Sequence, residues 1–268
     1  LLIFGNLGFP ELGLSGAAWA SLLAEGMALI FAILFIINKR YHLTFHLKEK
    51  FKILDFKNSS ELINLSYPVA ITQIISLSTW MAFFIMVEHI GTDELKVSHI
   101  TRNMLFLAFI AIFGLNRTAK TYVSTLAAEN RLKDILPTMK KMMIMSFIGV
   151  FILTSILWIS PQTILSIFKA EELTEMAKRV FLVIVPSMLL FSVGGIFFSA
   201  VDGFGDTKVT MVIEIIAIII YMLILYYLVE VNRQPIHIVW IVDLIYFSIL
   251  GTLSFLYLKL GKRKLIFE

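Results

Sequence analysis

Seven long stretches of the chain are almost entirely apolar, and polar or charged residues separate them. The stretches cover about residues 14–38, 65–87, 98–122, 142–160, 180–201, 209–229 and 236–260. A helix needs about 20 apolar residues to cross the hydrocarbon core of a bilayer, and each stretch is close to that length. The pattern predicts an all-α integral membrane protein with about seven transmembrane helices.

The composition supports this class of protein and excludes several others. Hydrophobic residues make up 59% of the 268 residues and charged residues 16%, whereas soluble domains contain about 45–50% and about 25%. The mean hydropathy is +0.88. The chain has no Cys, which excludes a disulfide scaffold, a CxxC redox motif and a thiolate metal site. A disordered chain and an ordinary cytosolic enzyme are excluded by the apolar content.

The basic residues lie at the ends of the apolar stretches, as membrane-flanking residues do. The net charge of +4 therefore does not indicate a nucleic-acid partner. Alternate connections carry fifteen Lys and Arg on one side of the membrane and five on the other. The positive-inside rule predicts that the richer side is cytoplasmic. We therefore expect a multi-pass protein of the inner (plasma) membrane with a cytoplasmic C-terminus.

The first connection has a mixed pattern of its own. Over residues 45–60, apolar residues alternate with lysines, which predicts a short amphipathic helix on the inner membrane surface, with a plain loop as the alternative. The chain also begins with Leu1 and runs at once into a structured motif. We expect it to be a fragment of a longer protein.

Three motifs, with their spacing along the chain, point to one family. The first is GFPELG at residues 8–13 followed by GAA at 16–18, the second is LSYPVAI at 65–71, and the third is GFGDT at 203–207. In this order, and with seven spans, they resemble signatures of the multidrug and toxic compound extrusion (MATE) family. The resemblance covers essentially the whole chain.

The resemblance implies a twelve-helix transporter built from two six-helix lobes, of which this chain holds helices six to twelve. Residues 1–40 would form the last helix of the N-terminal lobe, residues 41–62 a cytoplasmic amphipathic linker, and residues 63–268 the complete C-terminal lobe. Its partners would be the lipid bilayer, the missing N-terminal lobe and small amphiphilic or cationic substrates. Family members expel such compounds by alternating access in exchange for H⁺ or Na⁺, without any other cofactor.

One acidic residue lies in the middle of an apolar stretch and is a candidate for cation coupling. Glu25 follows Ser21 by four residues, so that both lie on one helix face. A carboxyl group inside the membrane is costly and suits reversible protonation. The resemblance places Ser21 at a hydroxyl position of a proton-linked pocket in the N-terminal lobe. The alternative for Glu25 is a structural hydrogen bond to a neighbouring helix.

Three further polar residues are candidates for the substrate cavity. Gln73 belongs to a polar stripe of the second span, Arg102 lies in the third span, and Asp243 lies in the outer third of the seventh. The alternatives are helix-to-helix hydrogen bonds for the stripe, a structural ion pair for Arg102, and a basic partner for Asp243. Pro186, within the fifth span, is either a static kink or a hinge.

Two further positions have less specific expectations. Glu214 is expected to contact Lys208 or Arg117, with a functional role as the alternative. Pro68 is expected in the first turns of its helix, where proline is well tolerated. Some family members carry a Na⁺-binding acid in the seventh helix and another acid in the tenth. Our alignment puts Ser76 and Phe191 there, which argues against a Na⁺ site in the C-terminal lobe and favours coupling in the N-terminal lobe.

Two other classes of function stay open. A lipid-linked oligosaccharide flippase of the same superfamily would share the fold but would be expected to show a more cationic cavity. A membrane enzyme or seven-helix sensor would need clustered His, Asp or Cys, or a lysine in mid-helix, and the sequence shows neither. His42 and His46 are four residues apart with no third ligand nearby, so we predict neither a metal site nor a catalytic site.

Overall fold

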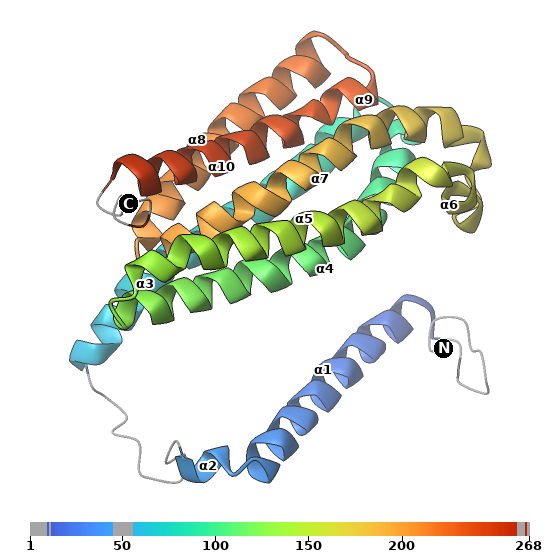
Figure 1. The fold of residues 1–268 in the computed structure, drawn as a ribbon. Coiled ribbons are helices and arrows are strands. Elements are labelled where there is room, and N and C mark those ends of the chain that lie inside the picture. The colour runs from blue at the N-terminus through green and yellow to red at the C-terminus, as the bar shows by residue number, and fades with distance from the viewer. Residues whose placement is uncertain (1–9, 11, 45–55, 262–265, 267–268) are drawn as a thin grey trace. The chain divides into compact units, whose positions relative to one another are not determined.

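The computed structural model describes residues 10, 12–44, 56–261 and 266, and these residues contain helices and no strand (Figure 1). Seven of the helices are long and apolar enough to cross a membrane. They are α1 (Gly13–Asn38), α3 (Phe56–Glu88), α4 (Thr92–Ala128), α5 (Ile135–Ile159), α7 (Thr174–Gly203), α8 (Thr207–Tyr226) and α10 (Ile241–Leu260). The predicted all-α membrane fold is confirmed.

Short helical elements connect the long helices. They are α2 (Tyr41–Thr44), α6 (Pro161–Ile167), α9 (Ile236–Val239), the 3₁₀ turns η2 (Leu132–Asp134) and η3 (Glu171–Leu173), and the π-helical turn η4 (Tyr227–Val231). Helix α6 begins with Pro161 at its first position, where the missing backbone N–H would have had no partner in any case.

The chain divides into two compact parts between residues 56 and 57. The first part holds α1 and α2, and the second holds the bundle from α3 onward. Most of the predicted surface helix, residues 45–55, lies outside the described residues. Residues 56–60 are not part of a separate helix, because they form the first turn of α3. The predicted domain boundaries stay a prediction.

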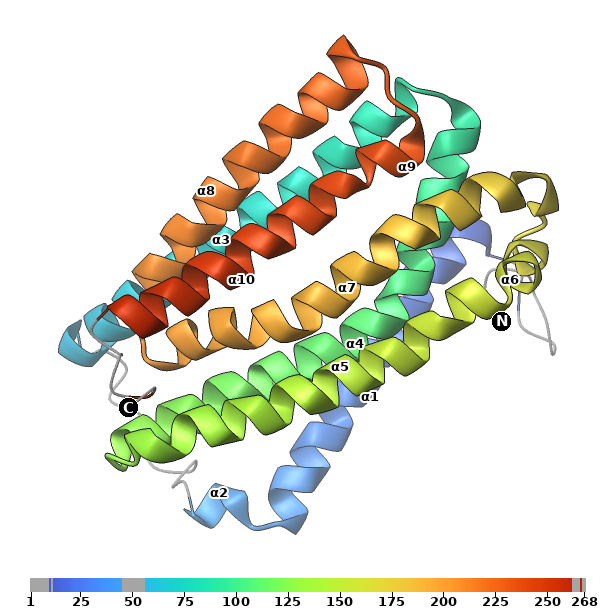
Figure 2. The same cartoon turned by 45° about the horizontal axis from the view of Figure 1, so that its top comes forward.

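Helix α7 is the centre of the second part. It packs against α4, α5 and α10, while α8 packs against α10. Figures 1 and 2 both show α7 lying between α10 and α5. At the α7–α10 crossing two glycines meet: a Cβ added to Gly194 would lie 3.0 Å from the Cα of Gly251. Small residues at such a crossing let two membrane helices approach closely.

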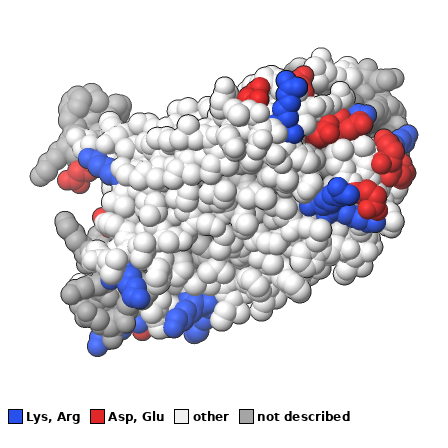
Figure 3. Space-filling model, turned by 90° about the horizontal axis from the view of Figure 1, so that it is seen from above, with Lys and Arg blue, Asp and Glu red and all other residues white. Residues whose placement is uncertain are grey.

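The outer surface of the helices is apolar, as a lipid-facing surface must be. Ile110, Ile159 and Leu223 expose 71%, 78% and 66% of their area. On the face shown in Figure 3, charged residues gather toward two ends, and the broad band between them carries almost none. A helix suits this environment because most of its backbone hydrogen bonds are made within the segment itself.

Helix α3 begins earlier than the sequence predicted, and this changes the position of Pro68. The helix starts at Phe56, so the buried Pro68 lies more than three turns inside it rather than in its first turns. A proline inside a helix removes one backbone hydrogen bond. Pro186 lies inside α7 in the same way, with its ring exposed. Its role as a hinge stays a prediction.

Candidate functional site

Two carboxyl groups are buried inside the second part of the chain, at the place where α3, α8 and α10 meet. Glu214 of α8 exposes 3% of its area and Asp243 of α10 exposes 5%. Three hydroxyl groups surround them, from Ser76, Tyr221 and Tyr246. We call these five residues the carboxyl cluster.

Glu214 receives two short hydrogen bonds on one oxygen. The Ser76 hydroxyl donates to Oε1 at 2.6 Å, and the Tyr246 hydroxyl donates to the same atom at 2.5 Å. The predicted contact with Lys208 or Arg117 is therefore wrong. The donors come from α3 and α10, so that one carboxyl oxygen of α8 ties three helices together. The side chains converge inside the bundle, whereas Lys208 and Arg117 are exposed.

Asp243 has fewer hydrogen-bond donors. Its carboxyl group lies beside Tyr221, which lines the same cavity, and one of its oxygens, Oδ2, is buried without any hydrogen-bond partner. Beside it lies a cavity of about 20 Å³, lined in part by Ser76, Tyr221, Asp243 and Tyr246. The expected basic partner of Asp243 is not found among the ion pairs of the described residues.

The carboxyl cluster has no compensating positive charge of its own. Within the described part of the chain, no ion pair includes Glu214 or Asp243. Leaving two ionised carboxylates uncompensated in a low-dielectric interior costs several kcal/mol each. Buried carboxyl groups within spanning helices are candidate functional groups, so the carboxyl cluster is a candidate functional site.

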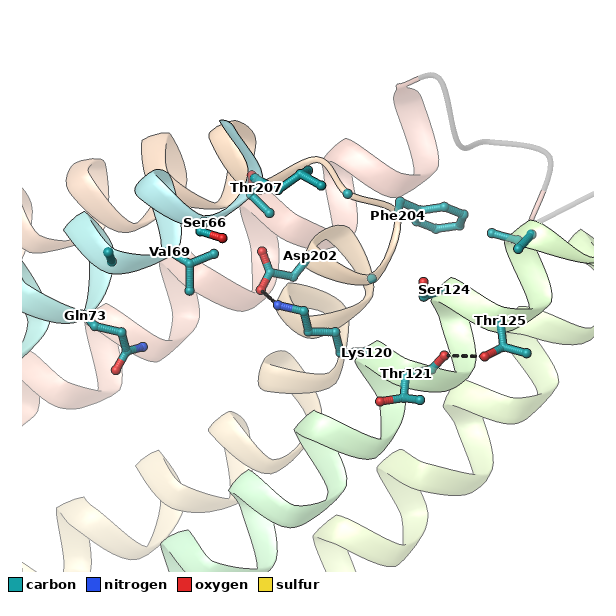
Figure 4. Close-up of a pocket in the computed structure, with 16 residues that line it drawn as sticks. Ser66, Val69, Gln73, Lys120, Thr121, Ser124, Thr125, Asp202, Phe204 and Thr207 are labelled. Carbon is teal, nitrogen blue, oxygen red and sulfur yellow. Dashed lines mark hydrogen bonds and ion pairs between the residues drawn. The ribbon is translucent and has the colours of Figure 1, made fainter. Parts of the chain in front are cut away.

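A second polar feature lies at the end of the bundle where α7 turns into α8. An open pocket of about 960 Å³ is lined by α3, by α4 and by the α7–α8 turn. Lys120 of α4 forms an ion pair with Asp202 of α7 at 2.7 Å (Figure 4), and Thr210 donates a hydrogen bond to the other oxygen of Asp202 at 3.0 Å. Gly205 makes the turn possible with a φ of 80°.

The predicted cavity residues do not come together at one place. Gln73 lines the open pocket beside the α7–α8 turn, while Asp243 belongs to the carboxyl cluster. Arg102 is half-buried in α4, with its guanidinium carbon 4.6 Å from the centre of the Phe84 ring and its Nε buried without a partner. The predicted ion pair of Arg102 is not found among the described residues.

The predicted coupling residues Ser21 and Glu25 both lie on α1, one helical turn apart. Because α1 belongs to the first part of the chain, these residues are described within that part alone. Their role in cation coupling stays a prediction.

Sequence reasoning missed the tyrosines of the carboxyl cluster, although a signal for them exists. Tyr221 follows Glu214 by seven residues, and Tyr246 follows Asp243 by three. Both spacings put the acid and the tyrosine on one face of a helix. Which two faces meet depends on how α8 and α10 pack, and the sequence does not contain that information in readable form.

Comparison with known proteins identifies the family of this chain. A family model described as MatE matches residues 68–228, which is more than half of the chain and includes Ser76, Glu214 and Tyr221. The chain belongs to the MatE family. The MatE region begins in α3 and ends in the π-helical turn that follows α8, so it covers most of the second part of the chain.

Individual relatives carry transport names. "Probable multidrug resistance protein NorM" of Thermotoga maritima is 25% identical over 99% of this chain and 58% of its own length. A protein of the same name from Rhizobium meliloti is 36% identical over 43% of this chain and 25% of its own length. "Uncharacterized transporter YisQ" of Bacillus subtilis is 31% identical over 42% of this chain and 24% of its own length. This MatE chain thus spans less than two thirds of the length of these curated relatives.

Proposed function

We propose that this MatE protein is a secondary active multidrug exporter, which expels amphiphilic or cationic compounds in exchange for H⁺ or Na⁺ by alternating access. Family membership supports the class of function, and the names of the NorM relatives support the type of substrate. The protein is a multi-pass membrane protein. Its placement in the plasma membrane with a cytoplasmic C-terminus rests on the distribution of Lys and Arg.

The observation that carries the cation coupling is the carboxyl cluster. Glu214 and Asp243 are buried at membrane depth, and no ion pair of the described residues neutralises them. A transporter that exchanges a substrate for a cation needs groups that bind and release that cation reversibly. Buried carboxyl groups that contact hydroxyl groups meet this need. No Lys or Arg side chain of the described residues is paired with them, so none competes with the transported cation for the carboxylate.

Ser76 offers a way for cation binding to act on a helix. Its hydroxyl has one hydrogen but two acceptors within reach, Oε1 of Glu214 at 2.6 Å and the backbone oxygen of Thr72 at 2.8 Å. When Glu214 is ionised, the hydrogen bond to the charged carboxylate is the stronger of the two. When Glu214 is protonated, the hydrogen of Ser76 is free to turn to Thr72. The tie between α3 and α8 then weakens, which allows α3 to move.

The test is efflux of a fluorescent cationic dye from cells that express the complete gene product. Efflux is measured with and without Na⁺ and with and without a protonophore, for the wild type and for Glu214→Gln, Glu25→Gln and Glu61→Gln. Glu61 is an exposed acid of α3 and serves as the matched control. We expect wild-type efflux to depend on one of the two gradients and Glu214→Gln to abolish that dependence, with the Glu61→Gln variant unchanged.

The result for each variant has a distinct meaning. If Glu25→Gln also abolishes coupled efflux, coupling involves α1 as well. If Glu214→Gln is as active as the wild type under every gradient, the carboxyl cluster does not couple transport. If the wild type moves no dye under any gradient, the exporter proposal fails, and transport of a lipid-linked substrate is the next activity to measure.

A further inference from the structure

The open pocket beside the α7–α8 turn has the size of a site for a small organic molecule. Its volume is about 960 Å³, within the range of about 300–1,000 Å³ that is typical of pockets for drug-sized ligands. Helices α3 and α4 and the α7–α8 turn contribute its lining (Figure 4). The pocket shares no lining residue with the cavity beside Asp243, so it is a separate feature of the bundle.

Most of the pocket lining is apolar or small. Leu65, Val69 and Phe204 contribute large apolar side chains, while small residues such as Ala70 and Ala128 leave space between the helices. Such a surface binds the apolar body of an amphiphilic molecule through the hydrophobic effect. The ring of Phe204 is in addition a type of group that attracts organic cations to its face.

The lining, as far as the structure describes it, contains two charged side chains, and these are the paired Lys120 and Asp202. A close approach of α4 and α7 sets their position. A Cβ added to Gly203 would lie 2.6 Å from the backbone oxygen of Lys120, so glycine is required for α7 to come this near to α4. Asp202, which precedes Gly203, is thereby held at the edge of the pocket.

The two members of this ion pair are held differently. Asp202 exposes 15% of its side chain, and its second oxygen, Oδ1, accepts a hydrogen bond from Thr210 at 3.0 Å. Lys120 exposes 44% of its side chain, and its flexible four-carbon stem allows the ammonium group to turn toward water. Because exposed ion pairs contribute little to stability, Lys120 is an exchangeable partner of a fixed acid.

This asymmetry selects the charge of a ligand. A cationic ligand with N–H groups can donate to Oδ2 of Asp202 in place of Lys120, in a charge-assisted hydrogen bond of the same kind. An anionic ligand would have to draw Lys120 away, which would leave Asp202, the more buried member of the pair, without a counter-charge. A neutral ligand would gain nothing from either charge.

We propose that this pocket binds a small amphiphilic organic cation, with Asp202 as its charged partner and Lys120 as the resident cation that the ligand displaces. The distribution of Lys and Arg predicts that this end of the bundle lies on the cytoplasmic side, from which an exporter takes up its substrate. The role of the pocket as an entry site therefore rests on the proposed exporter function, whereas the binding of the cation does not.

The test measures binding of rhodamine 123, a cationic dye with N–H groups, to the complete gene product purified in detergent. Binding is followed by fluorescence anisotropy, and the neutral dye Nile red is the reference. The variants are Asp202→Asn, Lys120→Met, Ala70→Phe and the control Lys133→Met. Ala70→Phe keeps every charge and fills part of the pocket. Lys133 is an exposed lysine of η2, shortly after α4, and lies outside the lining.

The expected effects differ in sign. Lys120→Met removes the competing cation, so the affinity for rhodamine 123 should rise about two- to fivefold, the range that corresponds to losing an exposed ion pair. Asp202→Asn should lower that affinity at least about tenfold, Ala70→Phe should lower it as well, and Lys133→Met should match the wild type. Nile red binding should be the same in both charge variants. A gain in Lys120→Met requires a folded protein, so it tests the site even if Asp202→Asn does not fold.

Several results would overturn the proposal. They are an unchanged or lower affinity of folded Lys120→Met for rhodamine 123, an equal gain in Lys133→Met, and no saturable binding by the wild type. Displacement of the dye by phosphatidylethanolamine, at amounts at which phosphatidylcholine has no effect, would make a lipid the occupant and would also overturn it. Absence of dye export with intact, Asp202-dependent binding would refute only the exporter function.

Discussion

The glycine crossing between α7 and α10 gives a prediction whose size follows from the structure. A Cβ added to Gly251 would lie 2.9 Å from the Cα of Gly194, closer than nonbonded carbon atoms normally approach, about 3.5–4.0 Å. The atom it meets belongs to the backbone of a neighbouring helix and has no rotamer to change. The two helices must therefore separate to accept the new methyl group.

The magnitude is the difference between two opposing effects of Gly251→Ala. Replacing glycine by alanine inside a helix stabilises it by about 0.5–1 kcal/mol. Overpacking a close contact destabilises by about 1–3 kcal/mol, and we take the upper half of that range because α10 makes its most extensive contact with α7. The net expectation is a loss of about 1–2.5 kcal/mol in the free energy of unfolding.

The assay is reversible unfolding of the complete gene product by SDS in mixed micelles, followed by the change in tryptophan fluorescence. Gly114→Ala is the matched control, because a Cβ added to Gly114 of α4 would have no neighbour within 4 Å. It should be neutral or slightly stabilising. If Gly251→Ala is as stable as Gly114→Ala, the close approach of α7 and α10 is not a feature of the folded protein.

Three further substitutions are predicted to have distinct effects. Ser76→Ala should reduce dye efflux, because it removes the hydrogen bond between α3 and α8. The control Ser78→Ala should leave efflux unchanged, because the exposed Ser78 hydroxyl donates only to the backbone of its own helix. Equal efflux by the two variants contradicts this prediction. A double-mutant cycle of Lys120→Met and Asp202→Asn should give a coupling of at most about 1 kcal/mol, because Lys120 is 44% exposed; a larger value indicates a buried pair. Pro186→Ala should raise the melting temperature and slow efflux, and unchanged efflux refutes the hinge.

The one-dimensional features of this protein could be predicted from its sequence. Continuous apolar stretches specify membrane helices because whether a segment can span the bilayer depends on its own apolar length and not on any other helix. The turn between α7 and α8 contains the GFGDT motif of the sequence, and Gly205 adopts the positive φ that such a turn uses. The start of α3 was predicted nine residues too late, because the apolar pattern marks the membrane segment and not the helical extension beyond it.

The candidate site could be predicted only in part. Asp243 was found because a lone acid in an apolar stretch is conspicuous, and Glu214 was found but given the wrong partners. Its true partners, Ser76 and Tyr246, lie 138 and 32 residues away along the chain. Nothing in the local pattern of α8 indicates which side chains of other helices will face it.

The sequence alone therefore determined the class of the protein, the number of its long membrane helices and the family to which it belongs. The tertiary structure decided which polar side chains meet, how close α7 and α10 approach, and which hydroxyl oxygens line the cavity beside Asp243. The physical reason is that membrane insertion depends on each segment separately. A binding site depends on the packing of several helices, where a rotation of one helix by a single residue would turn Glu214 or Asp243 away from its partners.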